Sequence, residues 1–185
     1  EENKDFLDTR SFGDKERVSV YSDIFIESML KNGVYPVVKH FPGNNADDPH
    51  LGLPVIDFDF ERTTEILLFP FDNIENKEEI GVLVAHSVVP ALFNKNEEPI
   101  PSCLSKTVVS NVLKNQLGYK GLIFSDDLLM AALQSNGYES VESISMAIKA
   151  GINVLMIAQK EYIPFINEIV KLCQSDIELV NQIEI

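Results

Sequence analysis

The chain has 185 residues, of which 45% are hydrophobic and 24% are charged, a balance typical of a globular domain. Its 15 basic and 29 acidic side chains give a formal net charge of −14, which argues against nucleic acid or an anionic membrane surface as a partner. No apolar run approaches the roughly 18 residues of a membrane span. The two cysteines, Cys103 and Cys173, show neither disulfide-framework nor metal-site spacing, so we expect reduced thiols and a cytoplasmic location.

Helical periodicity and strand patterns alternate along the first half of the chain. Apolar residues spaced three and four apart predict a helix from Val18 to Met29, with Asp14 as a candidate N-cap. The run at 34–38 (VYPVV) predicts the first strand, and a shorter helix is expected at about 61–68.

The same alternation continues to the end of the chain. Three further apolar runs predict strands, at 80–85 (IGVLVA), 122–124 (LIF) and 152–157 (INVLMI). Helical spacing predicts three further helices, over 109–113, 141–148 and 166–173. Strands alternating with helices in this way predict a parallel sheet with right-handed crossovers.

Polar side chains follow three of the four predicted strands. Lys39 and His40 follow the first, His86 the second, and residues 125–127 (SDD) the third, while His50 lies in the loop after the first strand. Because the carboxyl ends of parallel strands share one edge of the sheet, we expect a functional site there that gathers all three histidines. Lys39 and His40 supply donors suited to sugar hydroxyls or an anion; buried pairing with a carboxylate is the structural alternative.

Two acidic positions carry a specific chemical interpretation. Asp126 directly follows a buried strand, where a carboxylate can act as a nucleophile toward a sugar carbon or as a metal ligand. Asp127 fits better as the N-cap of a following helix. Asp48 precedes His50 by two residues, so its carboxylate can orient the imidazole for proton exchange near neutral pH. A solvated polar loop is the alternative for that pair.

Several of these residues belong to blocks that resemble a known family. Residues 38–43 (VKHFPG), followed by Asp48, His50 and 53–54 (LP), resemble the signature of family 3 glycoside hydrolases, in particular its β-N-acetylglucosaminidase branch. Further blocks agree in the same order, namely 10–13 (RSFG), 84–86 (VAH), 104–106 (LSK), 117–119 (LGY) and 121–128 (GLIFSDDL). The resemblance covers most of the chain, from Arg10 to about Ala158.

The resemblance implies an α/β fold of the (β/α)8 TIM-barrel type. Residues 1–185 would be a partial catalytic domain of about four βα units, the second half of that barrel. The implied activity is a retaining exo-β-N-acetylglucosaminidase, which releases terminal β-linked N-acetylglucosamine from peptidoglycan-derived or chitin-type oligosaccharides through a glycosyl-enzyme intermediate. No metal or organic cofactor is expected.

The resemblance also implies a role for each matching site residue. The nucleophile is Asp126, and the acid/base is His50, assisted by Asp48. Three further side chains correspond to the family's sugar-binding residues, namely Lys39, His40 and Arg10.

Other features of the sequence keep alternatives open. The loop before His50 is shorter than in the family, and Pro49 stands where the family has Ser or Thr. Half a barrel would leave strand edges and apolar surface uncovered, so we expect an N-terminal half-barrel segment or a second chain as a partner, besides the carbohydrate substrate. The alternatives are a non-catalytic carbohydrate-binding remnant, a phosphorylase, and a metal-dependent hydrolase with ligands His40, His50, His86 and Asp126.

Overall fold

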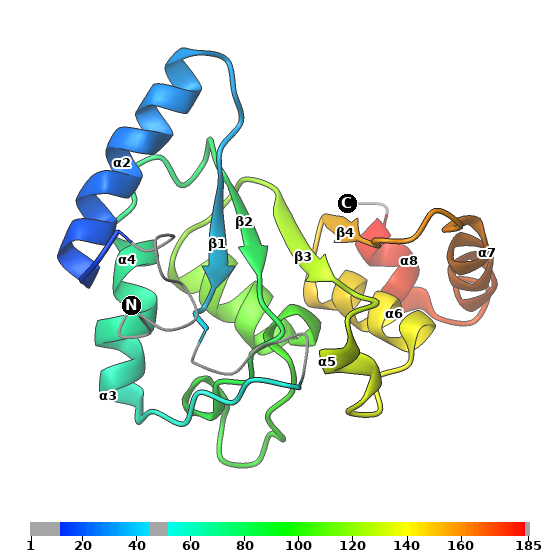
Figure 1. Ribbon diagram of the computed structural model, residues 1–185. Helices are drawn as coiled ribbons and strands as arrows, with labels where there is room; N and C mark the ends of the chain where they lie inside the picture. The colour runs from blue at the N-terminus through cyan, green and yellow to red at the C-terminus, as the bar shows by residue number, and fades with distance from the viewer. Residues whose placement is uncertain (1–11, 45–51, 184–185) are drawn as a thin grey trace.

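A four-stranded parallel sheet forms the centre of the molecule (Figure 1). The computed structural model describes residues 12–44 and 52–183. The strands are β1 (Val37–Phe41), β2 (Gly81–Val84), β3 (Ile123–Asp127) and β4 (Val154–Met156). They lie in sequence order, β1-β2-β3-β4, and each neighbouring pair is parallel. The order and direction predicted from the four apolar runs are therefore confirmed.

Helices precede, connect and follow the strands. The segment before β2 contains α2 (Lys15–Lys31), α3 (Phe60–Arg62), η2 (Thr63–Leu68) and α4 (Phe69–Asp72). Between β2 and β3 lie η3 (Pro90–Leu92), η4 (Ser102–Leu104) and η5 (Thr107–Gln116). The remaining helices are α5 (Ala131–Gln134), α6 (Ser140–Ala150), α7 (Ile163–Leu172) and α8 (Ile177–Ile183). In the described parts of the chain, every helix is too short or too polar to cross a bilayer.

Local sequence signals place the ends of several helices. The Asp14 side chain accepts a hydrogen bond of 2.9 Å from the Arg17 amide, which confirms it as the N-cap of α2. The Ser105 hydroxyl accepts a bond of 3.2 Å from the Val108 amide at the start of η5. Gly151, with a φ of 103°, ends α6 in the left-handed conformation that glycine favours, and β4 follows.

The two faces of the sheet have different environments. Val82, Val84 and Ile123 are completely buried in the core between the sheet and the helices that lie behind it in Figure 1. Alternate residues of a strand point to opposite faces. On the other face, which we call the open face, Val37 of β1 and Met156 of β4 are 38% and 39% exposed.

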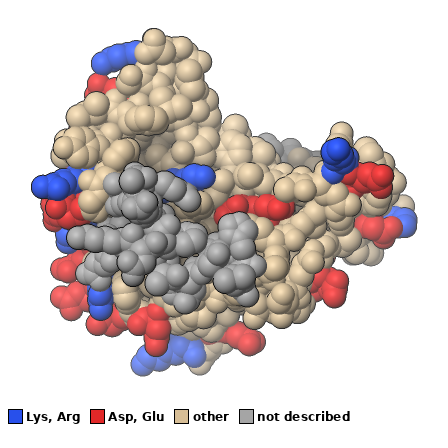
Figure 2. Space-filling view, in the orientation of Figure 1, with Lys and Arg blue, Asp and Glu red and all other residues tan. Residues whose placement is uncertain are grey.

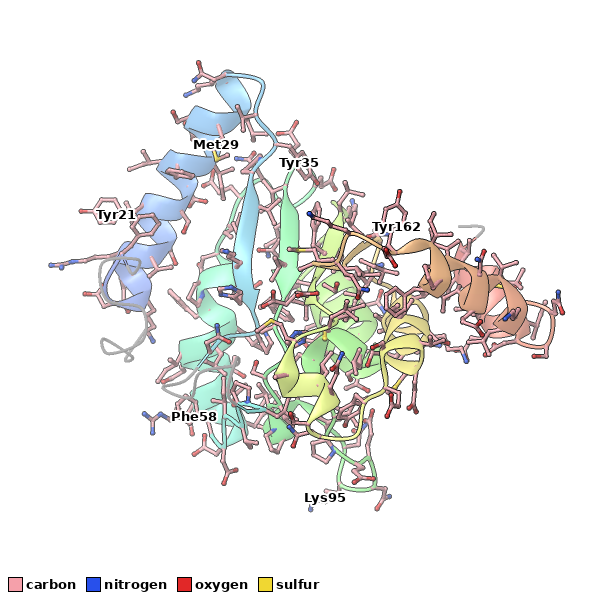
Figure 3. The ribbon with its side chains drawn as sticks, turned by 45° about the vertical axis from the view of Figure 1, so that its right-hand side comes forward. Tyr21, Met29, Tyr35, Phe58, Lys95 and Tyr162 are labelled. Atoms are coloured by element: carbon pink, nitrogen blue, oxygen red, sulfur yellow. The ribbon has the colours of Figure 1, made fainter. Side chains whose placement is uncertain are left out.

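Apolar side chains are also exposed on the helices at the two ends of the sheet. The α2 apolar surface forms a groove lined by Phe12, Tyr21, Ile24, Phe25 and Ser28. Figure 2 shows that the region over α2 is largely uncharged, and in Figure 3 Tyr21 projects away from the sheet. The α7 apolar surface consists of Tyr162, Ile163, Ile166 and Val170. Both surfaces lie beside edge strands of the described sheet, β1 and β4.

Three details differ from the sequence-based expectation. Lys39 and His40 lie within β1, because the strand extends to Phe41, three residues beyond the end of the apolar run at 34–38. The helix after β3 begins at Ala131 with Met130 as its N-cap, so Asp127 does not cap it. The sequence pattern also missed α8, whose seven residues offer little periodicity.

Candidate active site

The three polar residues that end β3 have separate structural roles. The buried Ser125 hydroxyl accepts a bond of 2.9 Å from the Met156 amide of β4. The Asp127 Oδ1 accepts bonds from the amides of Leu129 at 3.1 Å and Ala158 at 3.0 Å. The register between β3 and β4 shifts at this point. Side chains of Ser125 and Asp127 thus hold β4 where the regular ladder of backbone bonds is interrupted.

Asp126 differs from its two neighbours in where it lies. Its Oδ1 accepts a bond of 2.9 Å from the Asp127 amide, and the side chain is half-buried. The ladder between β2 and β3 is regular up to Ser125, which pairs with the buried Val84, so Asp126, the next residue, is turned to the opposite face, that of Phe124. Phe124 pairs with Leu83 of β2, and Leu83 pairs with Lys39 of β1. The carboxylate of Asp126 is therefore on the open face, at the carboxyl end of the sheet, where functional groups of parallel α/β folds gather.

Lys39 lies on the same face two strands away. One row of paired residues runs from Lys39 through Leu83 to Phe124, so β1 and β3 are about 10 Å apart at this level. Lys39 is exposed, while His40 is half-buried at the irregularity between Lys39 and Phe41. The structure therefore brings Lys39 and Asp126, two of the predicted site residues, to one side of the sheet.

His86 is in a different environment from the one predicted. It is only 1% exposed, its Nδ1 lies 3.1 Å from Cys103 Sγ, and its Nε2 lies 3.0 Å from the Asp127 carbonyl oxygen. Burial lowers the pKa of the imidazole. His86 therefore lies at the predicted edge of the sheet, but its ring is enclosed and bonded to the end of β3 instead of being exposed to a ligand. The apolar run before it was the available signal, but the sequence did not reveal its partner, Cys103.

The described residues also bear on the metal-dependent alternative. Among them there is no group of three or more His, Cys, Asp or Glu side chains placed to hold a metal ion. Both ring nitrogens of His86 are engaged in the hydrogen bonds given above. His86 is thus not available as the ligand that this alternative assigned to it.

Three predicted site residues, Arg10, Asp48 and His50, lie outside the described residues and remain predictions. The flanks of the loop that contains Asp48 and His50 are described. On one side, the Ser87 hydroxyl donates a bond of 2.8 Å to the Gly43 carbonyl oxygen.

On the other side of that loop, Val55 forms a parallel bridge with Val88, and the Ile56 amide donates a bond of 2.8 Å to the Val88 carbonyl oxygen. Both ends of the loop are therefore fixed just beyond the carboxyl end of β2, between β1 and β3.

A parallel sheet in sequence order, with helices on one face and a carboxylate at the carboxyl end of a strand, is the arrangement that βα-barrel enzymes repeat around their barrel. Residues 1–184 match the model of the glycosyl hydrolase family 3 N terminal domain, and the chain belongs to this family. The predicted family and the predicted α/β fold of TIM-barrel type are confirmed.

Similar proteins place the chain more narrowly. It is 28% identical over 152 residues to a protein named beta-hexosaminidase from Nitrosomonas eutropha, covering 81% of this chain and 42% of that protein. The structure of zinc-bound CbsA from Thermotoga neapolitana matches with a TM-score of 0.82 and 30% identity, covering 95% of this chain and 39% of that one. The β-N-acetylglucosaminidase from Thermotoga maritima matches with a TM-score of 0.79 and 28% identity, over 95% and 39% of the two chains. The chain thus spans about two fifths of these relatives.

Proposed function

We propose that this chain is part of a retaining exo-β-N-acetylglucosaminidase, which removes terminal β-linked N-acetylglucosamine from peptidoglycan-derived or chitin-type oligosaccharides. The observation that carries the proposal is the position of Asp126 on the open face at the end of β3, while Asp127 is held by two backbone amides. The names of the similar proteins, beta-hexosaminidase and β-N-acetylglucosaminidase, support the same substrate class.

In the proposed mechanism, Asp126 is the nucleophile. Its carboxylate attacks the anomeric carbon, a glycosyl-enzyme ester forms, and the bond to the leaving oxygen breaks while His50 gives that oxygen a proton. Water then attacks the anomeric carbon of the glycosyl-enzyme, His50 takes a proton from the water, and Asp126 is released as a carboxylate. Asp48 orients the imidazole of His50 for both steps.

The fixed flanks of the loop support this assignment of His50. The residues that flank the loop, Gly43 and Val55, are held beside the end of β2, the strand adjacent to β3, and this placement supports the proposal that His50 acts on the sugar that Asp126 attacks. Three side chains are proposed to bind the sugar, namely Lys39, His40 and Arg10. Lys39 is on the same face as Asp126, where its ammonium can donate to sugar hydroxyls.

We propose further that the active protein is completed by an N-terminal half-barrel segment or a second chain. In the described parts of the chain, β1 and β4 each pair with a single strand, and Val37, Met156 and the α2 and α7 apolar surfaces are exposed. The similar structures are more than twice as long as this chain. The two free cysteines fit a reducing compartment, and we propose the cytoplasm.

Turnover of a chromogenic β-N-acetylglucosaminide tests the proposal, measured with this chain alone and with the chain joined to its upstream segment. We expect turnover of the joined protein that survives a chelator, and no turnover by the chain alone. His50→Ala in the joined protein should lower kcat by about 10²–10⁴-fold. Sugar binding without turnover by the joined protein would favour the carbohydrate-binding remnant, and loss of activity with a chelator would favour the metal-dependent hydrolase.

A further inference from the structure

A buried pair of side chains lies directly beneath the proposed nucleophile. His86 follows β2, and Cys103 lies in η4, where its amide donates a bond of 3.1 Å to the Ala85 carbonyl oxygen. Cys103 is completely buried and His86 is 1% exposed. The catalytic steps proposed above use neither of them, and a ring this enclosed does not touch the sugar.

The hydrogen bonds define the protonation of this pair. A backbone carbonyl oxygen only accepts, so the 3.0 Å contact between His86 Nε2 and the Asp127 carbonyl oxygen requires a proton on Nε2. In the neutral ring Nδ1 is then an acceptor, and the Cys103 thiol donates to it across 3.1 Å. Burial lowers the pKa of His86 and raises the pKa of Cys103, and both shifts favour this neutral arrangement.

The Asp127 backbone connects this pair to the proposed nucleophile. The Asp127 carbonyl oxygen accepts from His86 and also from the Met130 amide at 3.1 Å. The Asp127 amide donates to the Asp126 carboxylate at 2.9 Å. Movement of the Asp127 backbone therefore changes the direction of a hydrogen bond to the Asp126 carboxylate, the one that the described residues supply.

We propose that His86 and Cys103 are positioning residues for the Asp126 nucleophile. Cys103 fixes the tautomer of His86, His86 fixes the Asp127 carbonyl, and the Asp127 amide holds the Asp126 carboxylate in the orientation for attack. The inference rests on the proposed function. A misplacement of about 1 Å at a reacting group is sufficient for roughly a 100-fold loss of rate.

The test compares kcat and KM of variants of the complete protein, meaning this chain joined to its upstream segment, on a chromogenic β-N-acetylglucosaminide. His86→Leu removes both hydrogen bonds and should lower kcat by about 10–100-fold, with KM within about threefold of wild type. His86→Gln keeps an amide donor for the Asp127 carbonyl and should recover most of that loss. Tyr119→Phe is the control, because it removes a buried bond of 2.8 Å to the Phe71 carbonyl oxygen without touching Asp127 or the flanks of the loop that contains His50.

The Cys103 variants make smaller changes to the same pair of side chains, and their kcat values test the inference if His86→Leu does not fold. Cys103→Ala should lower kcat by about 3–10-fold, and Cys103→Ser, which restores a donor to Nδ1, should return it to near the wild-type value. Equal kcat in these two variants, or equal loss of kcat in Tyr119→Phe and a folded His86→Leu, would overturn the inference. A wild-type protein without turnover would instead count against the proposed function itself.

Discussion

Replacing Asp127 separates its structural role from the chemical role proposed for Asp126. Asp127→Ala removes two hydrogen bonds from backbone amides to a carboxylate, those from Leu129 and Ala158. Bonds to charged groups contribute about 1.5–3 kcal/mol each, and because Asp127 is half-exposed we take the lower end. The expected loss is about 2–3 kcal/mol in the free energy of unfolding, or a decrease in Tm of about 4–12 °C for a chain of this size.

Two variants serve as controls in the same assay, thermal or urea unfolding followed by circular dichroism. Asp127→Asn keeps the accepting oxygen without its charge, so it should lose about half as much stability. Asp126→Ala gives up only the bond from the neighbouring Asp127 amide and should lose less than about 1 kcal/mol. If Asp127→Ala is as stable as wild type, the two bonds to the segments that follow β3 and β4 do not hold the end of the sheet, and the division of roles is wrong.

Three further predictions follow from the described residues. Gly121→Ala should cost at least about 2 kcal/mol in unfolding experiments, because its Cβ would overlap the Ile80 carbonyl oxygen, whereas Gly52→Ala, with open space around it, should cost under about 1 kcal/mol. The hydrogen bond from Lys149 lowers the pKa of Asp176 below its ordinary value of 3.8, so the link from α6 to α8 is present above about pH 4 and is lost as the pH falls through the lowered pKa. In that pH range, hydrogen exchange of the α8 amides should accelerate beyond the intrinsic rate in wild type. Asp176→Asn, which lacks the charge, should show no such acceleration. A thiol reagent should modify Cys173 in the native protein and Cys103 only after unfolding, since Cys103 is buried and burial raises its pKa; mass spectrometry that finds Cys103 modified first would contradict this.

Much of the fold was predictable from the sequence, for identifiable physical reasons. Strands covered by helices are apolar, so the runs around Val82, Ile123 and Leu155 predicted three of the strands. The alternation of these runs with helices predicted that the strands are parallel and lie in sequence order. The boundary of β1 was less predictable, because on an open face a strand can carry Lys39 as readily as an apolar residue. The capping residue Asp14 was predictable because its hydrogen bond is local.

The candidate site was predictable only in part. The sequence predicted that Asp126 and Lys39 lie toward the same edge of the sheet, and the register of the strands shows that they also share a face. The contacts of His86 with Cys103 and with the Asp127 carbonyl join segments distant in sequence, and no local pattern specifies them. The local pattern favours Asp127 as a helix cap, whereas its bond to the Ala158 amide depends on the register of β4, which the sequence does not specify.

Covalent trapping tests the central claim most directly. The complete protein is incubated with a fluorinated N-acetylglucosaminyl inhibitor that slows release of the glycosyl-enzyme, digested, and sequenced by mass spectrometry. We expect one sugar per protein, attached to Asp126, and no label in Asp126→Asn. A label on Asp127, or turnover that persists in Asp126→Asn, would contradict it.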